Sequence, residues 1–285
     1  MEKAILKTLY YADIFDYPLT IFEIHKWLIG RKATLRQVGK ALTSLSQNAK
    51  VKSKKEYYFL TKRTDLVGKR FRRFKQSTQY FKKAQMPTTF LKVIPWIKLM
   101  GISGGLAMEN ADKADDIDLF IICQKNRLWI TRLLVLGLLS LTGQRRKVSD
   151  MGRKIAGKFC VNTLLEEDKL EQDSKDIYLA HEVLQMKVLW QRDGIYSKYL
   201  ADNEWVFNFL PNWITNTRLK NIHKSSIVNH QSILDQIENL AKWFQMKIMK
   251  KPEGMERIED GALYFHPQDC RPKILKLYRQ KIGNP

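Results

Sequence analysis

The sequence predicts a mixed α/β (α+β) protein, in which a mixed sheet with helices follows a small helical N-terminal part and precedes a helical C-terminal region. Two observations predict this class. Apolar residues recur at helical spacing near both ends of the chain, whereas residues 116–123 form a β-branched and aromatic run typical of a strand. With 285 residues, 44% of them hydrophobic, the chain can build one large domain or two to three small ones.

The first 61 residues are expected to form three short helices and a hairpin. The expected helices cover residues 4–14, 20–28 and 34–45, and the strands cover 51–55 and 57–60. Thr20 and Glu23 have the spacing of a capping box, which satisfies free N–H groups at a helix start. This order of elements is that of a winged helix-turn-helix, a common nucleic-acid-binding layout.

Basic residues of the third helix and of the hairpin are the candidates for contact with nucleic acid. They are Arg36, Lys40, Lys54 and Lys55. The same layout also serves protein contacts or dimerisation, so DNA, RNA and protein all stay open as its partner. The oligomeric state is not readable from the sequence.

Residues 62–86 are expected to form a strongly basic linker helix. Phe71, Phe74 and Phe81 interleave with its charges, which fits either a solvated helix or one whose apolar side packs on the next domain. Pro87 predicts a break before that domain.

The chemistry is expected in the next segment, where a buried strand (97–102) runs into Ser103, Gly104 and Gly105. A Gly-Gly turn after a strand lets backbone N–H groups approach a phosphate closely. Asp116 and Asp118 follow on another strand, and residues two apart on a strand share a face. Two carboxylates on one face repel each other unless a cation lies between them, which indicates a divalent metal. The alternative is a strand end with exposed acids.

These motifs resemble the Gly-[Gly/Ser] … Asp-hydrophobic-Asp signature of the DNA polymerase beta-like nucleotidyltransferase superfamily. The elements expected around them follow that small fold: strand 97–103, helix 105–111, strand 116–123, helix 127–142 and strand 158–165. The order of winged helix, basic helix and this signature also resembles an uncharacterised group of bacterial nucleotidyltransferase-domain proteins, across most of the chain.

The resemblance implies Mg²⁺- or Mn²⁺-dependent transfer of a nucleoside monophosphate from a nucleoside triphosphate (NTP) to an unknown acceptor. Asp116 and Asp118 would be the catalytic metal ligands, and Ser103, Gly104, Gly105 and Asn162 would bind the nucleotide. Relatives have a third carboxylate on the strand at 158–165, where this chain offers Asn162, a weaker ligand. The alternative is therefore a winged-helix nucleic-acid-binding or regulatory protein with a catalytically degenerate nucleotidyltransferase domain.

Charge and cysteine content limit which partners and which cellular compartment we expect. The formal net charge of +21 favours a polyanionic partner, although a basic surface also serves solubility alone. Three widely separated cysteines (Cys123, Cys160 and Cys270) form no zinc or disulfide pattern and fit reduced thiols in the cytoplasm. Residues 128–142 are too short to span a membrane, so we expect a buried helix and no membrane partner.

The predicted organisation has four parts: a winged helix-turn-helix (1–61), a basic linker helix (62–86), a nucleotidyltransferase-like domain (87–170) and a helical C-terminal region (171–285). In the last part, helices are expected at 176–190, 196–209 and 233–249, and a loop at 218–230. His181 is expected to be a core histidine rather than a catalytic group.

Overall fold

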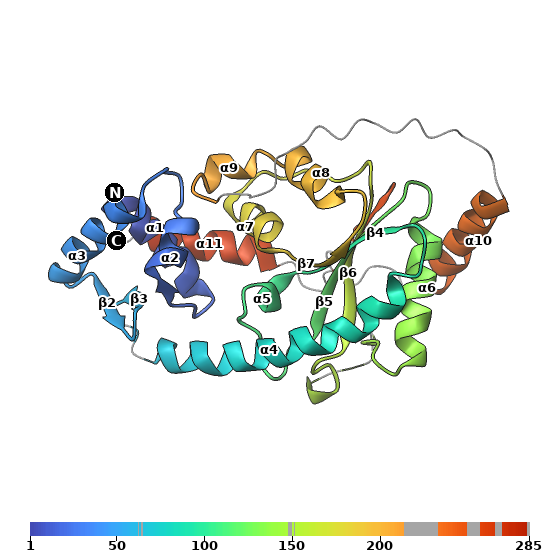
Figure 1. Ribbon diagram of the computed structural model, residues 1–285, viewed down its shortest axis with the longest axis horizontal. Helices are drawn as coiled ribbons and strands as arrows, with labels where there is room; N and C mark the ends of the chain where they lie inside the picture. Colours follow the sequence, from blue (N-terminus) through green and yellow to red (C-terminus); the bar gives the residue numbers. More distant parts are fainter. Residues whose placement is uncertain are drawn as a thin grey trace.

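The structure is a computed structural model that describes residues 1–61, 63, 65–147, 150, 152–213, 233–249, 257–265 and 270–283. It has the predicted α+β class, with one small sheet, one mixed six-stranded sheet and helices packed on both. Figure 1 shows an elongated molecule: the first 61 residues, hereafter the N-terminal module, lie at one end and the large sheet lies towards the other. One long helix runs along the side between them.

The N-terminal module contains the predicted helices and hairpin. Its elements are α1 (Glu2–Ile14), β1 (Leu19–Thr20), α2 (Ile21–Lys26), α3 (Leu35–Gln47), β2 (Val51–Lys54) and β3 (Tyr57–Leu60), and the strands pair antiparallel in the order β1-β3-β2. The predicted capping box is confirmed, because the Glu23 N–H donates to Thr20 Oγ1 at 3.2 Å and the Thr20 N–H donates to Glu23 Oε2 at 2.8 Å. The assignment of this module as a winged helix stays a prediction.

The basic helix α4 (Leu66–Leu91) is longer than predicted, and the break expected at Pro87 is absent. Pro87 has no N–H to bond the preceding turn, but the side chains of Thr88 and Thr89 donate to the carbonyls of Ala84 and Gln85, at 2.7 and 3.1 Å. Burial of Pro87 and Leu91 holds the last turn against the sheet domain. Tertiary packing therefore overrides the local signal of proline.

The phenylalanines of α4 divide between the two readings of this helix. Phe81 packs against the core of the large sheet, whereas Phe71 and Phe74 are about half exposed, at 47% and 48%. Phe71 still meets Tyr57 of β3 edge-on, with ring centroids 5.7 Å apart, so the interleaved aromatics contact both the sheet domain and the N-terminal module.

The large sheet contains the three strands predicted around the motifs. They are β4 (Ile97–Ile102), β5 (Ile117–Cys123) and β6 (Phe159–Glu166), joined by α5 (Gly104–Ala107), α6 (Leu128–Leu141) and a short 3₁₀ helix (Gly152–Lys154). β5 lies in the centre, antiparallel to β4 and parallel to β6. The strands at 97–103, 116–123 and 158–165 and the helix at 127–142 are confirmed to within one residue at each end, whereas α5 is shorter than expected.

The C-terminal region is not only helical, because it adds three strands to the same sheet. Its elements are α7 (Ile177–Gln185), β7 (Lys187–Gln191), α8 (Ile195–Asp202), α9 (Val206–Phe209), α10 (Ile233–Ile248), β8 (Arg257–Glu259), β9 (Ala262–Tyr264) and α11 (Cys270–Gly283). The sheet order is β7-β4-β5-β6-β9-β8, so these strands pair with both edges of the predicted core. The single helix expected at 176–190 ends at Gln185, and residues 187–190 instead pair with β4 as part of β7. The loop expected at 218–230 lies outside the described residues.

Helices cover both faces of the large sheet. One core joins α4 and α6 to residues such as Met100 and Ile121, and the other joins α7, α8 and α11 to residues such as Leu99 and Phe120. Tyr11 and Trp27 of the N-terminal module belong to the second core. Within the described part of the chain, no helix is long and apolar enough to cross a membrane.

One buried carboxylate fixes α6 against α10. Glu238 accepts hydrogen bonds from the N–H groups of Trp129 and Ile130, at 2.7 and 2.9 Å, in the first turn of α6. Gln245, about two turns further along α10, donates to the Trp129 carbonyl at 2.7 Å. A residue distant in sequence therefore caps the helix that follows β5.

We expect Glu238→Ala to lower the free energy of unfolding by about 2 kcal/mol, because two buried N–H groups lose a charged acceptor. Glu171→Ala is the control, since Glu171 is 59% exposed and pairs with Lys175 on the surface; we expect a loss below about 0.5 kcal/mol. Urea unfolding at neutral pH measures both. Equal losses in the two variants would show that the cap contributes nothing beyond a surface charge.

Candidate metal and nucleotide site

The two predicted aspartates lie together at the start of β5. Asp118 is the second residue of the strand and Asp116 directly precedes it. The parallel register of β5 and β6 pairs Asp118 with Cys160. One ligand atom from each of Asp116, Asp118 and Cys160 lies within 4.8 Å of the others, so this group can hold a metal ion.

The electrostatics of this group favour an additional cation. Burial raises the pKa of Asp118 well above its ordinary value, and the charges of Asp116 and Glu182 raise it further. Burial, then Asp118 and Asp116, raise the pKa of Cys160 to about 12. Arg146 opposes both shifts, and its Nη1 lies 2.5 Å from Asp116 Oδ2. A metal would compete with Arg146 for Asp116 and would stabilise the ionised forms of all three ligands.

Gly104 is required by its contact with Asp118. Its φ of +64° lies in the left-handed region, and a Cβ built on it would lie 2.8 Å from Asp118 Oδ2. A backbone hydrogen bond joins the same two segments, because the Ser103 N–H donates to the Asp118 carbonyl at 3.1 Å. Gly105 differs, since a Cβ there would meet only the Asn110 carbonyl at 3.7 Å. The predicted turn and the predicted carboxylates are thus in direct contact.

Asn162 lies on the cavity wall, but the third potential ligand atom belongs to Cys160. The two residues share one face of β6, and the Cys160 thiol donates to Asn162 Oδ1 at 3.7 Å. Sequence reasoning selected Asn162 as the polar residue in the place of a carboxylate. It missed Cys160 because the register between the parallel strands determines which residue faces Asp118, and this register is not visible in the sequence. The one available signal was strand alternation, which places Cys160 and Asn162 on the same face.

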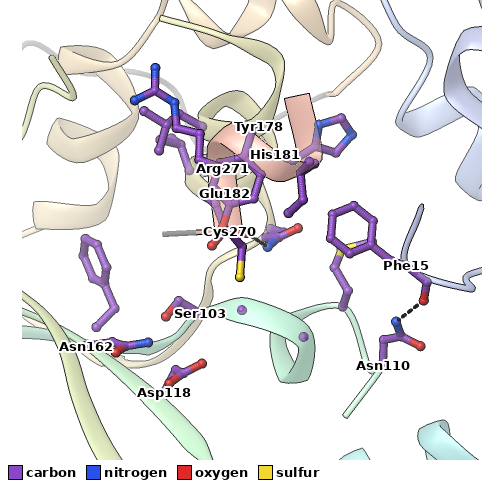
Figure 2. Close-up of a pocket in the computed structure, with 18 of the residues that line it drawn as sticks. Phe15, Ser103, Asn110, Asp118, Asn162, Tyr178, His181, Glu182, Cys270 and Arg271 are labelled. Carbon is purple, nitrogen blue, oxygen red and sulfur yellow. Dashed lines mark hydrogen bonds between the residues drawn. The ribbon is translucent and has the colours of Figure 1, made fainter. Parts of the chain in front are cut away.

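The group opens into a cavity of about 760 Å³. Its walls come from the turn after β4, from β5 and β6, from α7 and α11, and from α1 of the N-terminal module. Figure 2 shows Tyr178, Glu182 and Cys270 on one side of this space and Ser103, Asp118 and Asn162 on the other. The sequence did not indicate that both ends of the chain would reach the site.

Four charged residues of the cavity (Arg146, Glu182, Arg257 and Arg271) were not predicted, and the first two contact the predicted motifs. Arg146 comes from the segment between α6 and β6 and pairs with Asp116. Glu182 comes from α7, where burial raises its pKa to about 7 against hydrogen bonds from the Gly104 backbone and the Gln185 side chain. The Gln185 Nε2 lies 2.5 Å from Glu182 Oε1. One N–H of the predicted phosphate turn therefore already faces an internal carboxylate.

His181 is a packed core residue, as expected. Its ring stacks on Tyr11 and Trp27, with centroids 4.0 and 5.4 Å away, and its Nδ1 bonds the Ile177 carbonyl at 2.8 Å. Burial lowers its pKa to about 4, so the ring is neutral at physiological pH.

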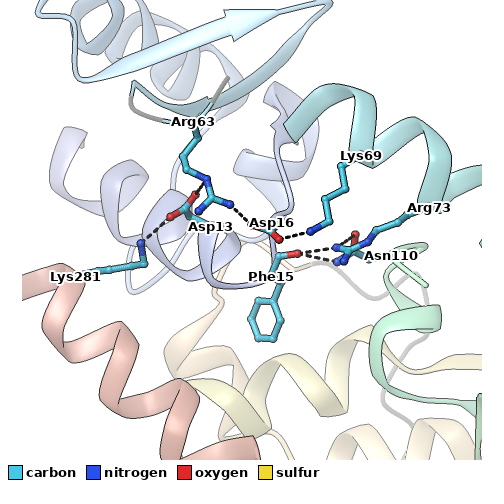
Figure 3. Close-up of polar contacts among 8 residues, drawn as sticks. All are labelled: Asp13, Phe15, Asp16, Arg63, Lys69, Arg73, Asn110 and Lys281. Atoms are coloured by element: carbon cyan, nitrogen blue, oxygen red, sulfur yellow. Dashed lines mark hydrogen bonds and ion pairs between the residues drawn. The ribbon is translucent and has the colours of Figure 1, made fainter. Parts of the chain in front are cut away.

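The end of α1 is bonded to the loop that follows the Gly-Gly turn. The Phe15 carbonyl accepts from Asn110 Nδ2 at 3.0 Å and from Arg73 Nη1 at 3.1 Å, and the Tyr17 hydroxyl donates to the Met108 carbonyl at 2.7 Å. Figure 3 shows the ion pairs around this junction: Asp16 with Arg63 and Lys69, and Asp13 with Arg63 and Lys281. The N-terminal module is thereby fixed to the site through α1.

The predicted nucleic-acid contacts are not part of this site. Arg36, Lys40, Lys54 and Lys55 are all exposed. In Figure 1, α3 and the β2–β3 hairpin lie at the end of the molecule remote from β5. The structure separates the basic surface of the module from the acidic group.

Fold and site define an α+β protein with a potential metal-binding group at the edge of a cavity. No protein-family model, no curated protein and no solved structure matches the chain. The likeness to nucleotidyltransferases therefore rests on the sequence signature and on the contact between the Gly-Gly turn and the aspartates.

We expect Gly104→Ala to cost about 1–2 kcal/mol of stability, because it forces a side chain into the left-handed region. It should also displace the Asp118 carboxylate and weaken Mn²⁺ binding at least about tenfold. Gly105→Ala is the matched control, since it adds one methyl group at ordinary van der Waals distance from the Asn110 carbonyl and should leave Mn²⁺ affinity unchanged. Urea unfolding with and without Mn²⁺ measures both effects. Identical behaviour of the two variants would contradict the contact.

Proposed function

We propose that the protein is a nucleotidyltransferase that moves a nucleoside monophosphate from an NTP to an acceptor hydroxyl, with Mg²⁺ or Mn²⁺. The close approach of Gly104 to the Asp118 carboxylate is the observation that carries this proposal. A glycine turn pressed against an Asp-x-Asp strand is what is needed to bring a triphosphate beside its metal. Nothing larger than glycine fits at this point without moving the carboxylate.

Each residue has a role in this proposal. Asp116 and Asp118 hold the metal, which when bound neutralises charge on the triphosphate and polarises the α-phosphate. Ser103, Gly105 and Asn162 face the same cavity and bind the nucleotide.

Arg146 lies at the same edge of the cavity, where it can pair with phosphate oxygens once a metal replaces it at Asp116. The bound metal ion then replaces the Arg146 guanidinium as the cation beside Asp116. Release of Arg146 and binding of the metal–NTP complex belong to one event.

Cys160 bears on the choice of metal. Mg²⁺ prefers oxygen ligands, whereas a thiolate is accepted more readily by Mn²⁺ and especially by Zn²⁺. A site with two carboxylates and one thiol should therefore favour Mn²⁺ over Mg²⁺. This also accounts for the missing third carboxylate, because the residue facing Asp118 is itself a potential ligand.

The proposal predicts that Asp116→Asn combined with Asp118→Asn lowers transfer at least about 100-fold, since the metal loses both carboxylates. The assay incubates the protein with labelled NTPs, Mn²⁺ or Mg²⁺, and either total RNA or a small-molecule extract. Asp193→Asn is the control, because this carboxylate is 62% exposed and pairs with Lys98. Transfer that survives in the double variant, or no NTP binding by the wild type, would reject the proposal.

The second candidate is a nucleic-acid-binding or regulatory protein with a degenerate nucleotidyltransferase domain. Its support is the outward position of Arg36, Lys40 and Lys54, none of which forms an ion pair with another described residue. Unpaired basic side chains on an exposed helix and hairpin are suited to phosphate contacts. In this reading, Arg146 is the permanent counter-ion of Asp116.

The second candidate predicts that Arg36→Ala combined with Lys40→Ala weakens binding to duplex DNA or RNA. The slope of log K against log salt should fall by about 2, one for each lost phosphate contact. Lys273→Ala combined with Lys276→Ala on α11 removes the same charge from exposed positions elsewhere and serves as the control. Equal effects of both pairs would mean that only net charge matters.

A further inference from the structure

The cavity continues beyond the metal group into a second compartment built by helices outside the sheet. It is lined by Phe15, which directly follows α1, by Tyr178 and Glu182 of α7, and by Ile274 of α11. Figure 2 shows Phe15 and Glu182 facing the same space, across from Ser103. A nucleotide held at Asp116 and Asp118 would leave this compartment free for another molecule.

Glu182 is the residue of this compartment that can accept hydrogen bonds from a ligand. Its carboxylate accepts hydrogen bonds from Gln185 and from the Gly104 backbone. It pairs with no Lys or Arg in the ion pairs of the described residues. A carboxylate offers about four lone-pair positions, so two remain for donors in the cavity. Because a partly buried carboxylate without a cation is costly, its retention beside the phosphate turn points to a ligand that donates to it.

Much of the remaining wall of the compartment is apolar, and its arginines are already paired. Tyr11, Ala12 and Ile274 are buried side chains of α1 and α11. Arg271 bonds Asp176 at 2.6 Å, and Arg257 pairs with Asp173 and Glu259. A ligand with several negative charges would therefore meet an unpaired carboxylate and apolar surface, and a phosphodiester chain is disfavoured.

Size sets a second limit. The whole cavity of about 760 Å³ lies within the range of about 300–1,000 Å³ that is usual for small-molecule sites. Part of this volume must hold the nucleotide. Only a compact second ligand fits in the remainder.

We propose that the space between Phe15, Tyr178 and Glu182 is an acceptor subsite for a compact, neutral or cationic organic molecule whose hydroxyl donates a hydrogen bond to Glu182. This inference rests on the proposed nucleotidyl transfer. The hydroxyl oxygen forms a bond to the α-phosphorus, and the bond from the α-phosphorus to the oxygen bridging to the β-phosphate breaks. Pyrophosphate leaves with that electron pair, and the hydroxyl proton passes to Glu182.

The experiment uses the full chain with Mn²⁺ and labelled NTPs. Label transfer is measured to three sets of probes: polyols and amino sugars, sugar phosphates, and an RNA oligonucleotide. NTP affinity is measured separately by equilibrium dialysis, and thermal unfolding checks that each variant is folded. We expect transfer to at least one polyol or amino sugar and none to RNA.

Two variants test the subsite itself. Glu182→Gln should lower kcat/KM for that acceptor at least about 100-fold while changing NTP affinity less than about threefold. Phe15→Trp reduces the free space and should raise the acceptor KM with little change in kcat. Glu171→Gln on the surface is the charge-matched control for Glu182→Gln and should leave both values unchanged.

The outcomes separate this inference from the proposed function. NTP binding together with transfer to RNA or to a sugar phosphate overturns the subsite and keeps the nucleotidyltransferase. Full activity of Glu182→Gln, or NTP binding without transfer to any polyol or amino sugar, also overturns the subsite alone. No NTP binding by the wild type overturns both.

Discussion

The site depends on one electrostatic constraint, which is the concentration of negative charge at the start of β5. Asp118 is held against Gly104 with Asp116 beside it, and burial raises the pKa of Asp118 well above its ordinary value. A carboxyl whose pKa is raised by folding contributes most to stability at low pH, and this contribution is lost as pH rises towards the raised pKa. At neutral pH this arrangement therefore lowers the free energy of unfolding, and a bound cation would reduce that loss. Arg146 does so in part, at Asp116.

The same constraint explains why distant segments meet at this point. The Gly-Gly turn needs a fixed loop behind it, and the N-terminal module supplies this through the Phe15 carbonyl and the Tyr17 hydroxyl. Arg73 of α4 bonds both Phe15 and Asn110, so the long helix ties the module to that loop. The module thereby forms part of the cavity as well as presenting a basic outer surface.

The sequence predicted those features that depend on local chemistry. The capping box at Thr20, the strand pair around Gly104 and Asp116, and the apolar helix after β5 follow from spacing and residue type over a few positions. β7 could not be predicted in this way, because Lys187 to Gln191 becomes a strand only by pairing with an edge of β4. Cys160, Arg146 and Glu182 reach the site through strand register, a loop and helix packing, and none of these is encoded in a short motif. The break predicted at Pro87 is wrong for the same reason, since the packing around this residue decides whether the helix continues.

If the protein is the proposed nucleotidyltransferase, the distribution of charge bears on which form of the nucleotide can enter. The chain as a whole carries +21, so its long-range field attracts any polyanion, including a free triphosphate. Close to the site the formal charges balance, because three acids (Asp116, Asp118 and Glu182) and three arginines (Arg146, Arg257 and Arg271) line the cavity. Each of these arginines already pairs with a carboxylate, so a free triphosphate that is drawn to the surface must compete for its cations inside the cavity. A metal–NTP complex brings its own cation to Asp116 and Asp118, so the pairing inside the cavity favours the complex over the bare anion.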